Sequence, residues 1–395
     1  MKKKIAIITD TGFQKKEFDM FYIKKLNKYF DIFVFDFTKI TNEELYRITK
    51  EKTLKVKNYY EIKNFEKFKF LNSKFQFTTV IKHISNYDLI LKIDKLFNEL
   101  GMSITNIQNH YVMQVKKTFI QKLYNYIFSI LDRKRLLGRL RYFFFKKKNT
   151  FFSTNIFVCG LKGLNDPSIG PKTKIIKSHS REYELHLQLF NKKNLFKPSI
   201  KYSVFLDQYL PFHTDGILIK KFNPKVTKEN YFPALNDFFN FWEKKTNTKV
   251  IIAAHPKSNY DSFKHNYWYG RSCYKNKTYE LIKNSKYVLG HQSTSISYAI
   301  IFNKPLIFLT SNEYMRSYDS FTVHGYAKYF QQPLFNINAA NDYIFKNTFK
   351  KINKKIYSEY FNNYIKFPDS SDLNIATVFK DFFKNNILDD SEKKA

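Results

Sequence analysis

Residues 287–299 read YVLGHQSTSISYA, and this stretch carries the clearest fold signal in the chain. A short apolar run at 287–289 is followed by Gly290, by several hydroxyl side chains and then by the pattern of a helix. A buried strand, a tight glycine turn and a helix start, in this order, are typical of a βα unit in a parallel sheet. We therefore predict a strand over 287–289 that leads directly into a helix.

The same alternation continues on both sides of this stretch. Short apolar runs separated by longer helical patterns favour parallel sheets with crossover helices over all-α or all-β folds. In the second half of the chain the predicted strands are 202–206, 249–254, 287–289, 305–309 and 334–337. In the first half they are 4–9, 32–37, 88–93, 155–159 and 174–177. The predicted fold class is α/β.

The length of the chain indicates more than one domain. Its 395 residues exceed one ordinary α/β domain and fit two domains of about 150 to 200 residues. A composition shift and Pro198 place the boundary near residue 198. We predict a first domain over 1–197, a second over 198–372 and a C-terminal helix and tail over 373–395, with the helix crossing back to the first domain.

The net charge of the chain favours anionic ligands but does not decide which kind it binds. The chain carries 68 Lys and Arg against 34 Asp and Glu, a formal net charge of +34, and its apolar content of 43% is enough for two folded cores. A positive field of this size attracts nucleic acid, anionic lipid or phosphorylated ligands.

Several features indicate the compartment. The two cysteines, Cys159 and Cys273, lie far apart and favour neither a disulfide framework nor a zinc site. The apolar run near the N-terminus is interrupted by Asp10 and is too short for a signal-peptide core. No stretch approaches the ~20 apolar residues that a membrane span needs. We therefore expect a cytoplasmic protein whose membrane contact is at most peripheral.

The segment 116–148 stands apart, because it has eleven Lys or Arg residues and a single acidic residue, Asp132. Aromatic and aliphatic residues recur within it at helical spacing. One interpretation is a helix that lies on an anionic inner-membrane surface, with its cations facing lipid phosphates. The other is a helix packed on the core with a solvated basic face, and the pattern leaves both open.

Polar residues follow several of the predicted strands in the second half. Parallel sheets of this class bind ligands at the carboxyl ends of their strands. A histidine there can donate to a phosphate oxygen, and hydroxyls beside the free N–H groups of a helix start suit an anion such as a nucleotide phosphate. The candidate residues are His255, Pro256, Lys257, His291, Ser293, Thr294, Ser295 and Glu313. A loop histidine and ordinary helix capping are the alternatives.

These motifs together resemble the C-terminal half of GT-B glycosyltransferases, particularly the bacterial sialyltransferases and Kdo transferases of surface-polysaccharide synthesis. The resemblance covers roughly residues 200 to 315 and implies two Rossmann-like domains facing a cleft. It also implies that His255 with Pro256, and Ser293 with Thr294, hold the phosphate of a CMP-sugar. Glycerophosphotransferases that form polymers share a similar strand, Ser/Thr-rich turn and helix, so the motif leaves the donor open.

The resemblance implies a catalytic carboxylate in the first domain that takes the proton from the acceptor hydroxyl. The family's acidic Asp-Gly motif has no clear copy here. Asp10 at the end of the first strand is our candidate, with His255 as the second catalytic residue, and a turn aspartate is the alternative. Further residues expected to border the cleft are Gly12, Asp207, Gln208, His213, Asp215, His179 and Arg181. For His179 and Arg181 the alternative is helix capping.

The resemblance thus implies inverting, metal-independent transfer of a sugar from a CMP- or UDP-linked donor to a bacterial surface glycan, with a lipid-linked acceptor. No Asp-x-Asp follows a strand, and dinucleotide and P-loop glycine motifs are absent, so neither a metal nor a cofactor is expected. One alternative is a glycerol- or ribitol-phosphate transferase. The other is a basic nucleic-acid-binding protein, but no binding module is recognisable and nucleic acid is not expected as a partner.

Overall fold

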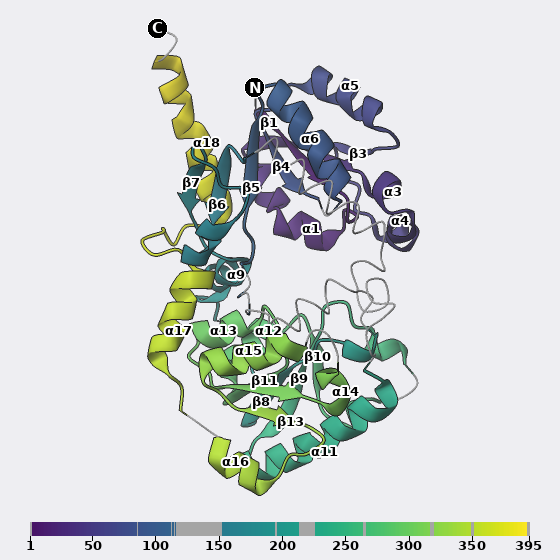
Figure 1. Ribbon diagram of the computed structural model, residues 1–395, viewed down its shortest axis with the longest axis vertical. Helices are drawn as coiled ribbons and strands as arrows, with labels where there is room; N and C mark the ends of the chain where they lie inside the picture. Colours follow the sequence, from purple (N-terminus) through teal and green to yellow (C-terminus); the bar gives the residue numbers. More distant parts are fainter. Residues whose placement is uncertain are drawn as a thin grey trace. The chain divides into compact units, whose positions relative to one another are not determined.

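The computed structural model describes residues 2–84, 86–111, 113, 115, 152–193, 196–212, 226–263, 266–316, 320–348 and 351–392 (Figure 1). The chain divides into two compact units. The first contains Met1–Tyr111, Thr118–Glu184 and Lys366–Ala395, and the second contains Val112–Lys117 and Leu185–Ile365. The basic segment 116–148 lies outside the described residues, so both interpretations of it stay predictions.

The first unit is built on a seven-stranded parallel sheet with the order β3-β2-β1-β4-β5-β6-β7. The strands are β1 (Lys3–Thr9), β2 (Phe30–Asp36), β3 (Tyr59–Glu61), β4 (Thr79–His83), β5 (Ser103–Ile107), β6 (Asn155–Val158) and β7 (Lys174–Lys177). Along the chain, β2 and β3 are added on one side of β1, and β4 to β7 are then added on the other side. This order creates a topological switch point between β1 and β4, where doubly wound sheets bind ligands.

Helices cover both faces of this sheet because alternate residues of β1 point to opposite faces. Ile5 and Ile7 belong to one apolar cluster, and Ala6 and Ile8 belong to the other. The helices of this unit are α1 (Lys15–Met20), α2 (Ile23–Leu26), α3 (Thr38–Thr41), α4 (Glu43–Thr49), α5 (Phe65–Phe75), α6 (Tyr87–Glu99) and α18 (Ile375–Glu392). Helix α9 (Arg181–Leu189) begins in the first unit, and its residues from Leu185 belong to the second.

The C-terminal helix α18 completes the core of the first unit. The Phe379 ring lies 5.7 Å from the Phe30 ring and 5.3 Å from the Phe157 ring, and Phe383 lies 6.4 Å from Phe30. Ile375 at the start of the helix is also buried. Helix α18 therefore packs on β2 and β6, which are far from it in the sequence. The domain limits predicted at 197/198 and 372/373 stay predictions.

The second unit contains a six-stranded parallel sheet with the order β10-β9-β8-β11-β12-β13. The strands are β8 (Tyr202–Leu206), β9 (Lys249–Ala254), β10 (Cys273–Lys275), β11 (Tyr287–Gly290), β12 (Leu306–Thr310) and β13 (Leu334–Asn336). The helices are α11 (Lys228–Thr246), α12 (Thr278–Asn284), α13 (Ile296–Ile301), α14 (Asn312–Met315), α15 (Ser320–Phe330), α16 (Asp342–Thr348) and α17 (Lys354–Tyr360). Trp242 of α11 is fully buried and donates from Nε1 to Ser203 Oγ at 2.9 Å.

The predicted α/β class and both parallel sheets are confirmed, but one predicted strand is wrong. The segment 88–93 lies within helix α6. Leu89, Ile93 and Phe97 are buried at a spacing of four residues, which is the period of a helix face. The Asn86 side chain accepts from Leu89 N at 3.0 Å and caps the start of this helix. No helix within the described residues is long and apolar enough to cross a membrane.

Candidate functional site

The second sheet has its topological switch point between β8 and β11, where Leu206 is the register partner of Gly290. A Cβ added to Gly290 would lie 3.3 Å from Leu206 Cβ, so glycine permits the close approach of the two strand ends. Beyond them, Gln292 N donates to Gln208 Oε1 at 3.3 Å. The predicted residue Gln208 therefore joins the two loops at the switch point.

The loop after β8 is organised by a buried carboxyl group. Asp207 is 6% exposed, and it accepts from Tyr209 N at 2.8 Å, from His255 N at 3.1 Å and from the Tyr260 hydroxyl at 3.0 Å. Burial raises the pKa of Asp207 to about 6, although these three hydrogen bonds lower it. Tyr209 has a φ of 55°, a left-handed conformation that is unusual for a bulky residue. Asp207 was predicted to border a cleft, but its contacts give it the role of holding the β8 and β9 loops together.

His255 follows β9 and is half-buried. Its backbone N–H is held by Asp207, and its ring Nδ1 accepts from Lys257 N at 3.2 Å. Since Nδ1 is an acceptor, Nε2 carries the hydrogen of the neutral ring. The side chain is therefore in the tautomer that can donate to an anion. Pro256 and Lys257, also predicted to bind the donor, are exposed on the same loop.

His291 does not have the surroundings of a phosphate ligand. It is 1% exposed, its Nδ1 donates to Leu309 O at 2.6 Å, and its Nε2 accepts from the Tyr231 hydroxyl at 2.7 Å. Burial lowers the pKa of His291 to about 4, although the hydrogen bond to Leu309 raises it. The ring is thus neutral, with both nitrogens paired inside the fold. These contacts tie the β11 loop to α11 and β12, and the binding of the donor by His291 stays a prediction.

The hydroxyl-rich turn 293–295 begins helix α13. Ser293 Oγ accepts from Ser295 N at 3.2 Å, and Ser293 O accepts from Ile296 N at 3.2 Å. Within the described residues, the backbone N–H groups of Ser293 and Thr294 and the exposed Thr294 hydroxyl have no hydrogen-bond partner. Two backbone donors and one hydroxyl donor thus remain available at this turn.

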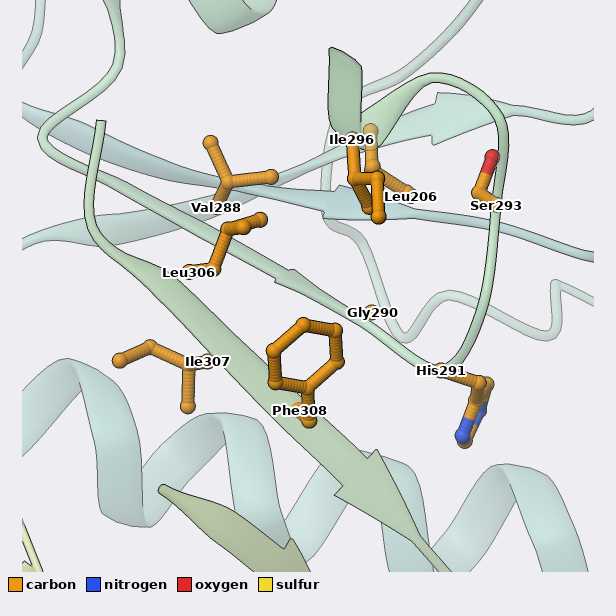
Figure 2. A pocket seen from close by; sticks show the side chains of 9 residues that line it. All are labelled: Leu206, Val288, Gly290, His291, Ser293, Ile296, Leu306, Ile307 and Phe308. Carbon is orange, nitrogen blue, oxygen red and sulfur yellow. The ribbon is translucent and has the colours of Figure 1, made fainter. Parts of the chain in front are cut away.

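A small apolar cavity lies beneath the turn, and its free space is no larger than a single water molecule needs (Figure 2). Leu206, Val288, Leu306 and Phe308 line it, and Ser293 lies on the loop at its side. The cavity is too small for a nucleotide or a sugar. Ligand binding at this edge would therefore use the surface of the loops rather than the cavity.

Glu313 also has a structural role that its position in the sequence did not indicate. Its carboxylate accepts from Thr227 N at 2.8 Å, from Thr227 Oγ1 at 2.7 Å and from Asn230 Nδ2 at 2.7 Å. Burial raises the pKa of Glu313, but these hydrogen bonds outweigh burial and the pKa is lowered. Since Thr227 directly precedes α11, Glu313 holds the start of this helix in place, and its role in donor binding stays a prediction.

At the edge of the first sheet, Asp10 follows β1 and is 2% exposed. Its Oδ2 accepts from Asn86 N at 2.7 Å, so it joins the β1 loop to the loop before α6 across the switch point. Gly12 has a φ of +80°, and its N–H donates to Thr38 Oγ1 at 2.6 Å. Asp10 is placed at the expected edge, but its burial disfavours proton transfer with an acceptor.

The other predicted residues have different surroundings. His179 is fully buried and its Nε2 lies 3.1 Å from Glu184 Oε2, and its place at the border of a cleft stays a prediction. Arg181 begins α9 and donates from its backbone to Asn109 O at 2.8 Å. His213 and Asp215 lie outside the described residues. Among the described residues, no group of three or more His, Cys, Asp or Glu side chains could hold a metal ion.

Sequence analysis missed a histidine–carboxylate pair in the first unit. His110 Nδ1 lies 3.0 Å from Glu182 Oε2, although 72 residues separate them. The signal that could have found His110 is its place just after β5, because the other candidates were chosen by the same rule. Since no strand was predicted at this position, the rule did not select His110.

The pairing of His291 predicts a pH dependence of stability. The unfolded chain takes up a proton near pH 6.5, whereas the folded ring does so only near pH 4. A histidine whose folded pKa is lowered loses stability as the pH falls through this window. We expect wild type to lose about 2 kcal/mol relative to His291→Gln between pH 7.5 and pH 5, measured by urea unfolding. A difference that does not change with pH would contradict the buried neutral ring.

Among the comparisons with known proteins, only the one with solved structures found similar proteins. No protein-family model matches the chain, and no curated protein matches it. Among solved structures, a variant of the wall teichoic acid polymerase TagF has a TM-score of 0.53 at 10% identity, covering 99% of this chain and 90% of that chain. The same variant soaked with CDPG for 15 minutes has a TM-score of 0.50 at 9% identity, covering 98% and 89%.

A further structure, the UDP-GlcNAc 2-epimerase of Methanocaldococcus jannaschii with UDP-GlcNAc and UDP, has a TM-score of 0.46 at 12% identity, covering 96% of this chain and 99% of that chain. At such low identities, the likeness to the polymerase concerns the fold alone. The chain is an α/β protein with two parallel Rossmann-like sheets and a GT-B-like fold.

Proposed function

We propose that the protein is an inverting, metal-independent transferase that takes a sugar from a nucleotide-activated donor to a bacterial surface glycan. The observation that carries this proposal is the tautomer of His255, which presents Nε2–H as a donor at the carboxyl edge of the second sheet. Ser293 and Thr294 add backbone and hydroxyl donors on the loop after β11. Because β9, β8 and β11 are neighbours, these groups are separated by two strand spacings, roughly 10 Å.

In this mechanism the donor phosphate is the leaving group. The acceptor oxygen forms a bond to the anomeric carbon, while the bond from that carbon to the phosphate oxygen breaks and its electron pair stays on that oxygen. Charge therefore grows on the phosphate as the bond breaks. His255 Nε2–H and the donors at Ser293 and Thr294 stabilise this charge more strongly in the transition state than in the bound donor.

The acceptor in this proposal is a lipid-linked oligosaccharide at the inner face of the cytoplasmic membrane. The net charge of +34 supports this proposal, because a positive field attracts anionic lipid headgroups. The segment 116–148 is the proposed contact, with eleven basic residues and one acidic residue. A sialic acid or a Kdo-like sugar is the proposed cargo, on the resemblance given by His255, Ser293 and Thr294.

A second candidate is a glycerol- or ribitol-phosphate transferase. The TagF match at a TM-score of 0.53 favours this candidate, because that protein is a wall teichoic acid polymerase and was also soaked with CDPG. The same phosphate-binding groups would serve it, but the acceptor oxygen would attack phosphorus instead of carbon. The leaving group would then be a nucleoside monophosphate.

A nucleotide screen followed by product mass tests both candidates. We expect CMP, CDP or UDP to raise the melting temperature, because a ligand at 100 times its Kd stabilises the native state by about 2.7 kcal/mol. Incubation with CMP-sialic acid, UDP-GlcNAc or CDP-glycerol and a bacterial lipid-linked oligosaccharide extract is then expected to yield one product. A mass gain equal to a sugar supports the first candidate, and a gain that includes phosphorus supports the second. If no nucleotide shifts the melting temperature at millimolar concentration, the nucleotide-donor proposal is wrong.

A further inference from the structure

One buried carboxylate at the carboxyl edge of the second sheet holds two loops together. Asp207 Oδ1 accepts from Tyr209 N at 2.8 Å, and Oδ2 accepts from His255 N at 3.1 Å and from the Tyr260 hydroxyl at 3.0 Å. Tyr209 belongs to the loop after β8, whereas His255 and Tyr260 belong to the connection that follows β9. The carboxylate therefore joins the end of β8 to two points of the next connection. All four residues lie in the second unit.

The hydrogen bond to Asp207 determines where the His255 ring lies. The N–H of His255 donates to Asp207, and its carbonyl oxygen accepts from Ser258 N at 2.8 Å, which closes a turn. Lys275 Nζ donates to Ser258 O at 2.6 Å, so the turn is also held at its other end. Within the turn, Lys257 N donates to the ring Nδ1 and sets the orientation of the ring. The direction of Nε2–H therefore depends on a turn whose first residue is held by Asp207.

The next residue of the chain holds the third loop of the candidate site. Gln208 Oε1 accepts from Gln292 N at 3.3 Å, and Gln292 directly precedes Ser293 and Thr294 in the loop after β11. Strand β8 lies between β9 and β11 in the sheet, so adjacent residues at its end can reach the loops on both sides. One of these loops carries His255, and the other carries the hydroxyl-rich turn. The end of β8 therefore fixes the separation of the two groups to which the proposed function assigns the donor phosphate.

We propose that Asp207 and Gln208 are the positioning residues of the donor site, Asp207 acting through His255 and Gln208 acting through the turn at Ser293 and Thr294. This inference rests on the proposed function, which assigns the leaving phosphate to these groups. A group misplaced by about 1 Å can cost on the order of 10²-fold in rate. A residue that holds such a group in place therefore affects the reaction without touching the donor.

The positioning by Asp207 requires its ionised form. Three donors approach its two oxygens, and an ionised carboxylate can accept from all of them. A protonated carboxyl group or an amide would present a hydrogen of its own, and one of the three donors would then lose its partner. Among the described residues no Lys or Arg contributes to the pKa of Asp207, so these hydrogen bonds are what favour the charge. Asp207→Asn therefore removes the positioning while it keeps the shape of the side chain.

The first experiment measures the His255 ring directly, by ¹⁵N-edited NMR of the full chain with labelled histidine. His255→Ala assigns the signal, and the neutral wild-type ring is expected to be protonated on Nε2 and unprotonated on Nδ1. In Asp207→Asn the turn loses its anchor, so we expect both tautomers to be populated. Asp237→Asn is the matched control, because Asp237 is exposed on α11 of the same unit. An unchanged His255 signal in a folded Asp207→Asn variant would overturn the proposal.

The second experiment separates the two residues by turnover and nucleotide affinity, with whichever of CMP-sialic acid, UDP-GlcNAc or CDP-glycerol the wild type consumes. Asp207→Asn is expected to lower kcat by on the order of 10- to 10²-fold, while the Kd of the matching nucleotide changes less than about threefold. Gln208→Ala is expected to weaken nucleotide binding by about two- to tenfold with kcat nearly unchanged, because it loosens the other loop. The opposite assignment of the two effects would contradict the proposal.

A double variant tests whether Asp207 acts through His255. When Asp207→Asn is added to His255→Ala, kcat should fall by no more than about twofold, since the group that Asp207 positions is already missing. A merely structural Asp207 would lower kcat by the same factor in both backgrounds. Effects that multiply in full would therefore overturn the proposal.

The pH dependence of turnover gives an independent measurement. Burial raises the pKa of Asp207 to about 6, so the ionised form is lost as the pH falls through this value. The titratable side chains that face it are Tyr209, Tyr231, Tyr260 and Cys273. Burial raises the pKa of each of them, so none ionises near pH 6.

The ratio of kcat in wild type to kcat in Asp207→Asn should therefore fall by about five- to tenfold between pH 7.5 and pH 5. Both proteins contain His255 and use the same donor, so the titrations of the ring and of the phosphate cancel in this ratio. A ratio that does not change with pH would contradict the role of the ionised carboxylate.

The outcomes separate this inference from the proposed function. If wild type transfers and Asp207→Asn transfers equally well, the positioning role is wrong and the proposed function stands. If wild type binds no nucleotide and consumes no donor, the proposed function is wrong, and the NMR signal of His255 alone decides whether Asp207 positions the ring. If Asp207→Asn loses its cooperative melting transition, Tyr260→Phe takes its place, because it removes one hydrogen bond that lowers the pKa of Asp207. The pH at which kcat falls should then move upward, and an unchanged pH would overturn the proposal.

Discussion

Replacement of His255 by Ala is expected to lower turnover by on the order of 10²-fold, with a much smaller change in donor affinity. The reason is that the Nε2–H of this ring should bind most strongly when charge has developed on the leaving phosphate. The backbone N–H of residue 255 still donates to Asp207 in the variant, so the loop after β9 keeps its anchor. The exposed Lys257 N–H loses the ring acceptor and can bind water instead. Steady-state kinetics and nucleotide titration measure the two effects separately.

Thr294→Val is the companion variant for this experiment. It keeps the shape of the side chain and removes an exposed hydroxyl that has no partner among the described residues. We expect it to weaken nucleotide binding by about 1 to 2 kcal/mol, the value for a hydrogen bond to a charged group, with little change in kcat. Full activity in both variants would mean that the phosphate is bound elsewhere.

Replacement of Glu184 by Ala is expected to lower the free energy of unfolding by about 3 to 5 kcal/mol, because three donors lose a charged acceptor and each such hydrogen bond contributes about 1 to 3 kcal/mol. Glu184 accepts from Lys25 Nζ at 2.9 Å, from His179 Nε2 at 3.1 Å and from the backbone N of Ile375 at 2.9 Å. The variant leaves the fully buried His179 without this partner and releases the first turn of α18. Urea unfolding gives the energy, and limited proteolysis detects loosening of α18.

The pH dependence of this effect follows from the pKa of Glu184. Burial raises this pKa, but the hydrogen bonds from His179, Lys25 and Ile375 outweigh burial and lower it to about 2. A carboxyl with a lowered folded pKa contributes fully above its unfolded value near 4.5 and loses its contribution as the pH falls toward 2. The difference in the free energy of unfolding between wild type and Glu184→Ala should therefore become smaller as the pH falls from about 4.5 toward 2. Glu99→Ala is the control, because the Glu99 side chain is 59% exposed, and it should lower the free energy of unfolding by less than about 0.5 kcal/mol. An equal loss in Glu184→Ala and Glu99→Ala would contradict the buried network around Glu184.

The strands that the sequence predicted best are those buried on both faces. Segments 202–206 and 249–254 match β8 and β9 because their apolar runs are continuous and bounded by polar residues. Strands β3, β4, β5 and β10 were missed, since they are short or carry polar residues that break the run. The segment 88–93 shows the opposite error, because six residues are too few to distinguish a buried strand from a helix face.

The position of the candidate site could be predicted, but the state of its side chains could not. A polar residue after a strand marks the carboxyl edge of a parallel sheet, and this rule placed Asp10, Gln208, His255 and Ser293 at such edges. Whether a side chain faces solvent depends on distant partners. His291 is paired with Tyr231, 60 residues away, and Glu182 with His110, 72 residues away. Local spacing contains no information on either pair.

The packing of α18 on β2 and β6 has a consequence for the order in which the protein is made. Phe379 and Phe383 belong to the same apolar cluster as Phe30 and Phe157, so this cluster lacks part of its core until the ribosome has synthesised residues 379 to 383. At about 5 to 20 residues per second, synthesis of the intervening residues takes on the order of 10 to 40 seconds. The residues of the second unit between 185 and 365 emerge within that interval. During it, the face of the first sheet that awaits α18 exposes phenylalanine rings, which makes the nascent chain a substrate for chaperones that bind apolar surface.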